Sequence, residues 1–188
     1  MADQTIYALI LRPVGQLLEA LRIESFSLSV ENDDLVVRDK TPGRKQITPR
    51  EKALLAEWQV THTRPQDKEG ALKLANGILE WRMTPDDIDR LERQGRSRRR
   101  NPNLTPDIHS VSQMLRVVGA LVDHKNGRLL QLTKEDQKLT FEYELVSGKK
   151  VAEELGVPAL YDLWVRIYRR QSPKELAEAP IRWFDPWG

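Results

Sequence analysis

The chain of 188 residues contains no cysteine. This absence excludes disulfide bonds, thiolate metal ligands and a cysteine nucleophile, and it fits the reducing environment of the cytosol. Long apolar runs are also missing, since none approaches the roughly 20 residues needed to span a bilayer. The N-terminus has no basic segment followed by a hydrophobic stretch and a small-residue cleavage site. We therefore expect a soluble, cytoplasmic protein with no membrane partner.

The sequence also lacks a strong net charge and the familiar catalytic motifs. Lys and Arg number 30 against 28 for Asp and Glu, a balance of +2 that does not by itself indicate a nucleic acid or a membrane surface. There is no GxSxG nucleophile elbow, no GxxxxGK phosphate loop and no GxGxxG fingerprint. The three histidines, His62, His109 and His124, form no HExxH pair. The sequence predicts a non-enzymatic protein with no catalytic residues, no metal and no cofactor.

What the chain does contain is a stretch that occurs twice. Residues 11–38 align without a gap on residues 115–142, at an offset of 104 positions, and eight of the 28 aligned positions are identical. The identical pairs are Leu11/Leu115, Arg12/Arg116, Val14/Val118, Gly15/Gly119, Leu17/Leu121, Leu28/Leu132, Glu31/Glu135 and Leu35/Leu139. An ungapped match that also keeps the apolar pattern predicts a duplicated structural unit.

Each copy changes its hydrophobic period once. Apolar residues of 6–21 recur every three or four positions, which predicts one helix, either starting at Pro13 or kinked there. From 26 to 37 the period is two, interrupted by the polar turn ENDD, which predicts a β-hairpin with a four-residue turn. Thr48-Pro49-Arg50-Glu51 then starts a second helix. The second copy repeats the helix and the hairpin, with KEDQ as its turn.

The segments outside the two copies give weaker signals. We expect a strand at 78–83, after either a hairpin turn or a helix end at Asn76-Gly77. A helix starts at Thr84-Pro85 and runs into an arginine-rich loop. Ser147-Gly148 ends the last strand of the second copy, and we expect a helical turn at 151–155 and a helix at about 159–170.

These patterns predict the α+β class: an internally duplicated helix-strand-strand-helix unit forming a four- or five-stranded antiparallel sheet, with helices packed mainly on one face. We divide one compact domain into a first repeat unit (1–58), a connecting segment with a strand, a short helix and an Arg-rich loop (59–104), a second repeat unit (105–171) and a C-terminal aromatic tail (172–188). Gly15 and Gly119 share one place in the main helices, which favours close backbone approach over space for a ligand.

The densest charge cluster of the chain is basic. Five arginines fall within eight residues, namely Arg93, Arg96, Arg98, Arg99 and Arg100. Such a cluster can neutralise phosphates, which makes it a possible nucleic-acid-binding site with little sequence preference. No aromatic residues interleave with it, so stacking on single-stranded bases is not indicated. The competing interpretations are a solvated linker and a contact with an acidic protein.

The tail carries the aromatic residues Trp183, Phe184 and Trp187. Chain termini fray unless they are tied down, so these side chains are expected to dock on the protein itself or on another subunit. The tail is therefore a possible protein interface, and we expect a protein partner or a homodimer.

Three functional hypotheses follow. The leading one is a non-enzymatic binding protein, a regulatory or scaffolding protein-interaction module with internal pseudo-twofold symmetry. The first alternative is an accessory nucleic-acid-binding protein that uses the Arg-rich segment 93–100. The second alternative is a small-molecule binder or an enzyme with a site between the two repeats.

The carboxylates of Glu142 and Glu144 project from one sheet face, which we interpret as the solvent side.

Overall fold

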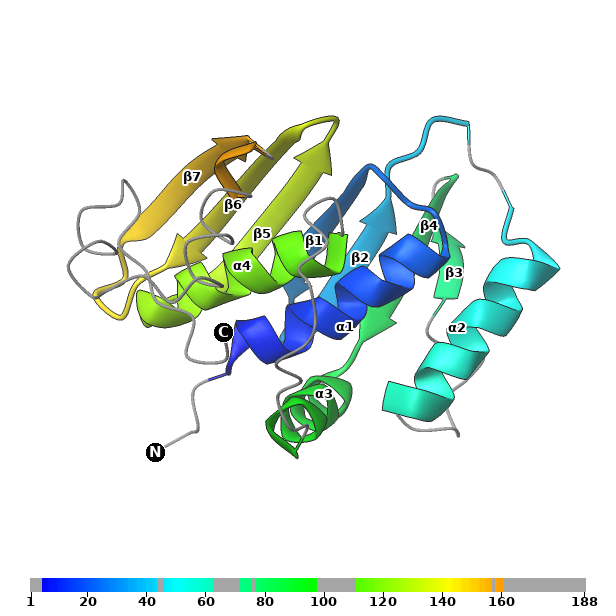
Figure 1. The fold of residues 1–188 in the computed structure, drawn as a ribbon, viewed down its shortest axis with the longest axis horizontal. Helices are drawn as coiled ribbons and strands as arrows, with labels where there is room; N and C mark the ends of the chain where they lie inside the picture. The colour runs from blue at the N-terminus through cyan, green and yellow to red at the C-terminus, as the bar shows by residue number, and fades with distance from the viewer. Residues whose placement is uncertain are drawn as a thin grey trace.

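The structure is a computed structural model that describes residues 5–43, 46–62, 72–75, 77–97, 111–156 and 158–160. Within these described residues, seven strands form one antiparallel sheet in the order β3-β4-β2-β1-β5-β6-β7. The labelled helices all lie on the same face of this sheet (Figure 1). The strands are β1 (Phe26–Glu31), β2 (Asp34–Asp39), β3 (Leu72–Ala75), β4 (Ile78–Met83), β5 (Arg128–Glu135), β6 (Lys138–Glu144) and β7 (Lys150–Gly156). The helices are α1 (Tyr7–Ala20), α2 (Pro49–His62), α3 (Pro85–Ser97) and α4 (Val111–His124). None of these helices has the length and apolar character needed to cross a bilayer.

The α+β class with an antiparallel sheet is confirmed, but the expected number of strands is wrong, because the sheet has seven. Strand β4 is the strand predicted at 78–83, and β3 pairs with it antiparallel, from Leu72 opposite Trp81 to Ala75 opposite Ile78. Of the two alternatives for the preceding segment, the strand is therefore the one that forms. Strand β7 occupies the place where we expected a helical turn at 151–155. The reason lies in Gly148, which adopts a φ of +80° and donates its N–H to the Leu145 carbonyl at 2.8 Å. This geometry reverses the chain into a further strand instead of ending the sheet.

The turns of the two first hairpins are shorter than the predicted four residues. Glu31 pairs with Asp34 across the first turn, and Glu135 pairs with Lys138 across the second. Asn32 and Asp33 both have positive φ values, 51° and 67°. Asn and Asp tolerate this left-handed conformation, so two residues suffice to connect the strands.

The core lies between the sheet and the helices. Its sheet side is made of alternating apolar residues: Phe26, Leu28, Leu35, Val37, Trp81, Met83, Leu129, Leu132, Leu139, Phe141 and Tyr143. Helix α1 continues through Pro13, so the longer of the two predicted helices forms. The Trp58 indole N–H donates to the Pro13 carbonyl at 2.9 Å. The Trp58 ring packs edge-on against the Trp81 ring, with the ring centroids 4.8 Å apart. These contacts hold α2 against α1 and β4.

Helices α1 and α4 cross in backbone contact at their two glycines. A Cβ atom on Gly15 would lie 2.4 Å from the Ser112 Cα, and one on Gly119 would lie 2.5 Å from the Ala8 backbone nitrogen. Real Cβ atoms do not approach backbone this closely, so both positions need a residue without a side chain. The predicted close approach of backbones is confirmed.

Each of the two helices also caps the other. The Asp123 carboxylate, in the last turn of α4, accepts the N–H groups of Tyr7 and Ala8 at 2.8 and 2.9 Å. The Glu19 carboxylate, in the last turn of α1, accepts the Ser112 N–H at 2.7 Å. The first N–H groups of a helix have no partner within it, and a carboxylate there also interacts favourably with the helix dipole. Thus the first N–H groups of each helix take their hydrogen-bond acceptor from the other helix.

Residues 104 positions apart occupy matching places. The bounds of α4 are those of α1 plus 104, because 7 + 104 = 111 and 20 + 104 = 124. Leu28 pairs with Val37 in the first hairpin, and Leu132 pairs with Phe141 in the second. Leu28 and Leu132 themselves pair where β1 meets β5. The two hairpins are therefore arranged around this leucine pair.

Candidate functional site

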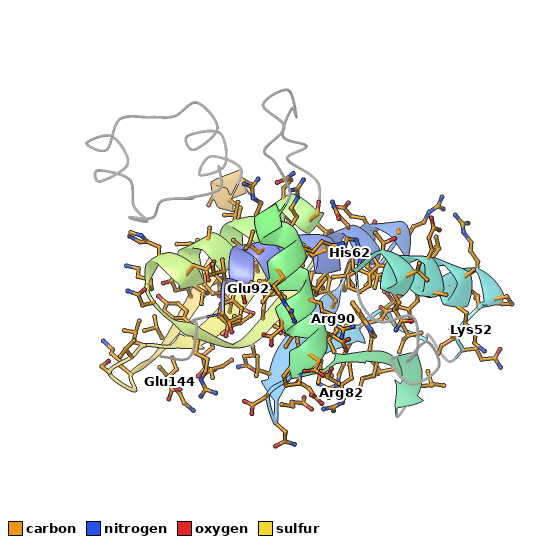
Figure 2. The ribbon with its side chains drawn as sticks, turned by 90° about the horizontal axis from the view of Figure 1, so that it is seen from below. Lys52, His62, Arg82, Arg90, Glu92 and Glu144 are labelled. Carbon is orange, nitrogen blue, oxygen red and sulfur yellow. The ribbon has the colours of Figure 1, made fainter. Side chains whose placement is uncertain are left out.

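The face of the sheet opposite the helices carries the candidate site, and we call it the open face. Figure 2 shows Arg82 and Glu144 pointing away from the helical layer, whereas Lys52 and His62 lie within it. Side chains reach this face because they alternate with the core residues along each strand. Serine, threonine and glutamine line its centre on β1, β5 and β6, and charged residues surround them. The open face carries two features: a network of ion pairs on β1, β2 and β4, and a groove on β5, β6 and β7.

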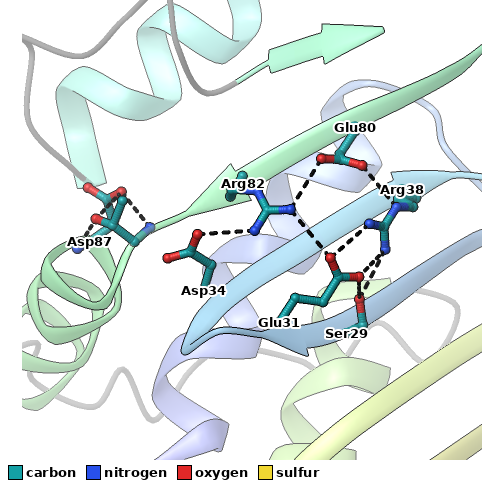
Figure 3. Close-up of polar contacts among 8 residues, drawn as sticks. Ser29, Glu31, Asp34, Arg38, Glu80, Arg82 and Asp87 are labelled. Carbon is teal, nitrogen blue, oxygen red and sulfur yellow. Dashed lines mark hydrogen bonds and ion pairs between the residues drawn. The ribbon is translucent and has the colours of Figure 1, made fainter. Parts of the chain in front are cut away.

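The network is built around the Arg38 guanidinium (Figure 3). Two parallel hydrogen bonds join it to Glu31, from Nη1 to Oε1 at 2.7 Å and from Nη2 to Oε2 at 3.1 Å. Its Nη1 also donates to the Ser29 hydroxyl oxygen at 3.1 Å, and its Nε donates to Glu80 Oε2 at 3.0 Å. Bidentate pairs of this kind are stronger and more directional than single ion pairs. Arg38, on β2, is thus held in one orientation by residues of the two neighbouring strands, β1 and β4.

Arg82 extends the network along β4. Its Nη1 donates to Asp34 Oδ2 at 3.1 Å, and its Nη2 donates to Glu31 Oε2 at 3.3 Å. Glu80 Oε1 lies 3.6 Å from the same Nη2, so Glu31 and Glu80 each contact both arginines. The Glu80 side chain is only 8% exposed. Because burying a lone carboxylate is unfavourable, the two arginines are what allows Glu80 to lie there.

The electrostatics of the network are visible in its pKa values. Hydrogen bonds from Arg38 and then Ser29 lower the pKa of Glu31 to about 2. The Glu31 partner raises the pKa of Arg38, and the Asp34 partner raises that of Arg82. All three groups are therefore charged over the whole neutral range, and the network presents fixed charges rather than a titrating group.

The groove beside the network has a volume of about 360 Å³. The side chains that line it include Gln131, Thr133, Thr140, Glu142 and Glu154. Gln131 Nε2 donates to Glu142 Oε2 at 2.8 Å, and Lys138 Nζ lies 2.9 Å from Glu154 Oε2. The groove can accept hydrogen bonds from a polar or basic group through its carboxylates and hydroxyls.

The predicted arginine site is only partly described. Arg93 is exposed on α3 and its Nε donates to the Asp89 carbonyl of the same helix at 3.2 Å. Arg96 belongs to α3, with its side chain outside the described part, and Arg98, Arg99 and Arg100 lie outside the described residues. Helix α3 is in the helical layer, so Arg93 does not join the open face.

The predicted aromatic interface of Trp183, Phe184 and Trp187 lies outside the described residues, and so does His109. His62 Nδ1 is 2.7 Å from Gln94 Oε1, a contact between α2 and α3. Glu142 and Glu144 do share the open face, where Glu142 accepts from Gln131 and Glu144 accepts from Arg128. The hydrogen bond from Arg128 lowers the pKa of Glu144.

The Arg38–Arg82 network was not among the predicted sites. Its members come from three strands, and β4 follows β2 only after α2 and β3. The local signal was the alternation of Ser27, Ser29 and Glu31 with the core residues of β1. That pattern predicts a polar face, but it does not reveal that β4 supplies Glu80 and Arg82.

Comparison of the chain with models of known protein families, with curated proteins and with solved structures finds no match.

Proposed function

We propose that this protein acts by binding, as a regulatory or scaffolding module that presents its open face to a protein partner. The proposal rests on Arg38 and Arg82, whose side chains are already ordered in the free protein. Their guanidinium groups are held by Glu31, Asp34 and Glu80 before any partner arrives. Ordering a flexible side chain on binding costs about 0.5–1.5 kcal/mol, and a surface that is already ordered avoids much of this loss.

The charges of the open face favour a protein over a nucleic acid. Arg38, Arg82 and Lys138 are each within 3.1 Å of a carboxylate oxygen. A polyphosphate backbone would meet these carboxylates and be repelled. A protein surface with both signs of charge can match them, and charge complementarity of this kind contributes mainly to specificity and association rate.

The internal duplication is part of the same proposal. We infer that the two halves are copies of one unit related by a pseudo-twofold axis through the Leu28–Leu132 pair. Support comes from the helix bounds, from the hairpin registers, and from the caps, because Glu19 and Asp123 also lie 104 positions apart. The open face would then be one surface made jointly by both copies.

A site-specific photocrosslinker tests the proposed face. Placed at Thr133, in the centre of the open face, it is expected to capture a protein partner in the cells that make this chain. The matched control is Lys52, an exposed residue of α2 in the helical layer. With the captured partner purified, Thr133→Arg should weaken its binding at least tenfold, because the bulky charged side chain blocks the face. Capture at Lys52 alone, or unchanged binding by Thr133→Arg, would contradict the proposal.

A second candidate function is nucleic-acid binding by the segment 93–100. The observation in its favour is that Arg93 is exposed on α3, and this helix lies on the helical side of the sheet. Fluorescence anisotropy with a DNA duplex, a single strand and an RNA hairpin tests it, at about 50 and 200 mM salt. Binding should weaken steeply with salt and disappear when Arg96, Arg98, Arg99 and Arg100 are all changed to alanine. No binding at the lower salt concentration would remove this candidate.

The aromatic tail remains a proposed contact surface for a homodimer. Deletion of residues 181–188 should then lower the mass in sedimentation from dimer to monomer. An unchanged mass would count against a dimer held by the tail.

A further inference from the structure

The edge of β7 on the side away from β6 is a second surface, separate from the open face. Among the described strands, β7 pairs only with β6, through seven consecutive residue pairs. The Leu145 N–H donates to the Lys149 carbonyl at 2.8 Å, so this pair is a hydrogen-bonded one. Hydrogen-bonded and non-bonded pairs alternate in antiparallel strands. Val151, Glu153 and Leu155 therefore bond to β6, whereas Lys150, Ala152, Glu154 and Gly156 direct their N–H and C=O groups outward.

We propose that two copies of this chain associate by antiparallel pairing of β7 with β7, with Ala152 opposite Ala152 of the second copy on a twofold axis. The side chains of Lys150, Ala152 and Glu154 all lie on the open face. In this register Lys150 faces Glu154 of the second copy, and Glu154 faces Lys150 of the second copy. The edge is thus complementary to itself, as a twofold interface requires.

Backbone geometry and charge together select this register. If the register of the β7–β7 pair shifted by one residue, a residue with outward-directed N–H and C=O groups would face a residue whose groups are already bonded to β6. The ladder of hydrogen bonds between the two copies could then not form. A shift by two in one direction centres the pair on Glu153 and leaves Lys150 opposite Gly156. A further shift in that direction brings Glu154 opposite Glu154. Like charges directly opposite each other destabilise a strand pair, and opposite charges stabilise it.

The surrounding side chains fit the same arrangement. Arg128, Glu144 and Lys150 follow one another across β5, β6 and β7, with Arg128 Nη2 2.6 Å from Glu144 Oε2. Glu154 of the second copy would continue this alternation of charge across the edge. On the helix side, the Glu153 carboxylate accepts a hydrogen bond from the Tyr143 hydroxyl at 2.7 Å and is thereby held toward β6 within its own chain. Ala152 on the axis is small enough for close approach of its counterpart.

The pairing would also place both open faces on the same side of one continuous sheet. A twofold axis that relates two edge strands in this way is perpendicular to the sheet, so it keeps the helical layers together on the other side. After β7 the chain turns toward the helices, where Leu160 is 2% exposed in the core. The inference stands on the β7 edge alone and does not depend on the proposed partner of the open face.

A charge exchange at two positions tests the proposal. The wild-type protein should approach twice the mass of one 21.7 kDa chain in sedimentation equilibrium at low salt, over about 5–200 μM protein. Lys150→Glu sets two carboxylates opposite each other at both ends of the pair, and Glu154→Lys sets two ammonium groups there. Each single variant should raise the dimer dissociation constant about tenfold or more. The double variant K150E/E154K should restore it to near the wild-type value.

Mixing the two single variants gives the sharpest readout. Lys150→Glu has two acidic residues on its edge and Glu154→Lys has two basic ones, so the two should form a mixed dimer although neither pairs well with itself. The Glu154–Lys138 contact within one chain changes in Glu154→Lys, and melting curves of both variants control for this. Restoration in the mixture depends on contacts between copies, which a change within one chain cannot supply.

Ala152→Pro provides an independent variant. Proline removes the outward N–H of residue 152 and leaves the bonds to β6 intact, so the monomer should keep its melting temperature while the dimer is lost. A wild-type protein that stays monomeric at the highest concentration would overturn the proposal. So would a dimer whose mass is indifferent to Ala152→Pro and to both charge changes, because such a dimer uses another surface. Deletion of residues 181–188 separates that case from a dimer held by the aromatic tail.

Discussion

Leu28 and Leu132 lie opposite each other where β1 meets β5, and around this pair the two halves of the sheet can be compared position by position. On the side that faces the helices they agree. Leu35 and Leu139 are both buried, as are Val37 and Phe141. The glycines of the helix crossing and the two carboxylate caps also correspond. Packing between sheet and helices leaves little freedom for change.

On the open face the same comparison finds reversed charges. Position 38 is arginine and its counterpart 142 is glutamate. Arg82 pairs with Val36, and Glu154 pairs with Thr140 at the equivalent place in the second half. Asp34 likewise corresponds to Lys138. The two halves therefore match on the core side of the sheet and differ in the charges of the open face.

The largest expected effect tests the shared core. Leu28→Ala and Leu132→Ala each remove a fully buried side chain from the centre of the sheet. Each should lower the free energy of unfolding by about 2–5 kcal/mol, and the two losses should be similar because the environments correspond. Urea denaturation measures both. A loss in one variant several times that in the other would break the equivalence of the halves.

The glycine crossing is expected to give the next largest effect. Gly15→Ala and Gly119→Ala each insert a methyl group against the backbone of the other helix, which should destabilise the protein by about 1–3 kcal/mol or more. Gly156→Ala is the control, because its Cβ would meet only Pro158 Cδ at 3.6 Å. Thermal unfolding of the three variants should rank the control nearest to the wild type.

The reversed positions should differ in stability. Arg38→Ala leaves Glu80 buried with one of its two arginine partners gone, which should cost about 1–3 kcal/mol. Glu142→Ala changes the equivalent position on the other half, where the contact to Gln131 is exposed, and should cost less than about 0.5 kcal/mol. Equal losses in denaturant titrations would show that the network is no more than a set of surface ion pairs.

The smallest predicted effect is the pH dependence that Glu31 contributes. The pKa of Glu31 falls from its ordinary value of 4.5 to about 2 in the folded protein. The unfolded chain therefore takes up the proton first, so the stability that Glu31 contributes is complete above pH 4.5 and is lost as the pH falls toward 2. Glu31→Gln should flatten the decline of unfolding free energy in this window. A decline as steep in Glu31→Gln as in the wild type would contradict the prediction.

Local and repeated signals predicted much of this fold. The hairpins, the helix start at Thr48 and the glycine crossing follow from period, cap and repeat. The Thr48 N–H does donate to the Glu51 carboxylate at 2.9 Å, and the Glu51 N–H to the Thr48 hydroxyl oxygen at 3.2 Å. Strand β7 was not predicted, because Val151 and Leu155 are its only large apolar residues. An edge strand buries few side chains, so its apolar period is weak.

The candidate site was less predictable. Glu80 and Arg82 meet Arg38 only because β4 pairs with β2, opposing Arg82 to Val36 and Glu80 to Arg38. Neither charge nor periodicity within one segment encodes that pairing. The arginines of 93–100 are close together in the sequence, whereas the residues of the network come together only in the folded sheet.

The exchanged caps of α1 and α4 have a consequence for how the chain folds. The carboxylate that completes the start of α1 lies 116 residues after Tyr7, and the one that completes α4 lies 93 residues before Ser112. Contacts so distant along the chain require a large loop to close before they can stabilise anything, which slows folding. During synthesis α1 emerges long before Asp123, so its first turn must wait for nearly two thirds of the chain. Folding of the first half is thereby tied to completion of the second, and the two halves are expected to fold in one cooperative step rather than in succession.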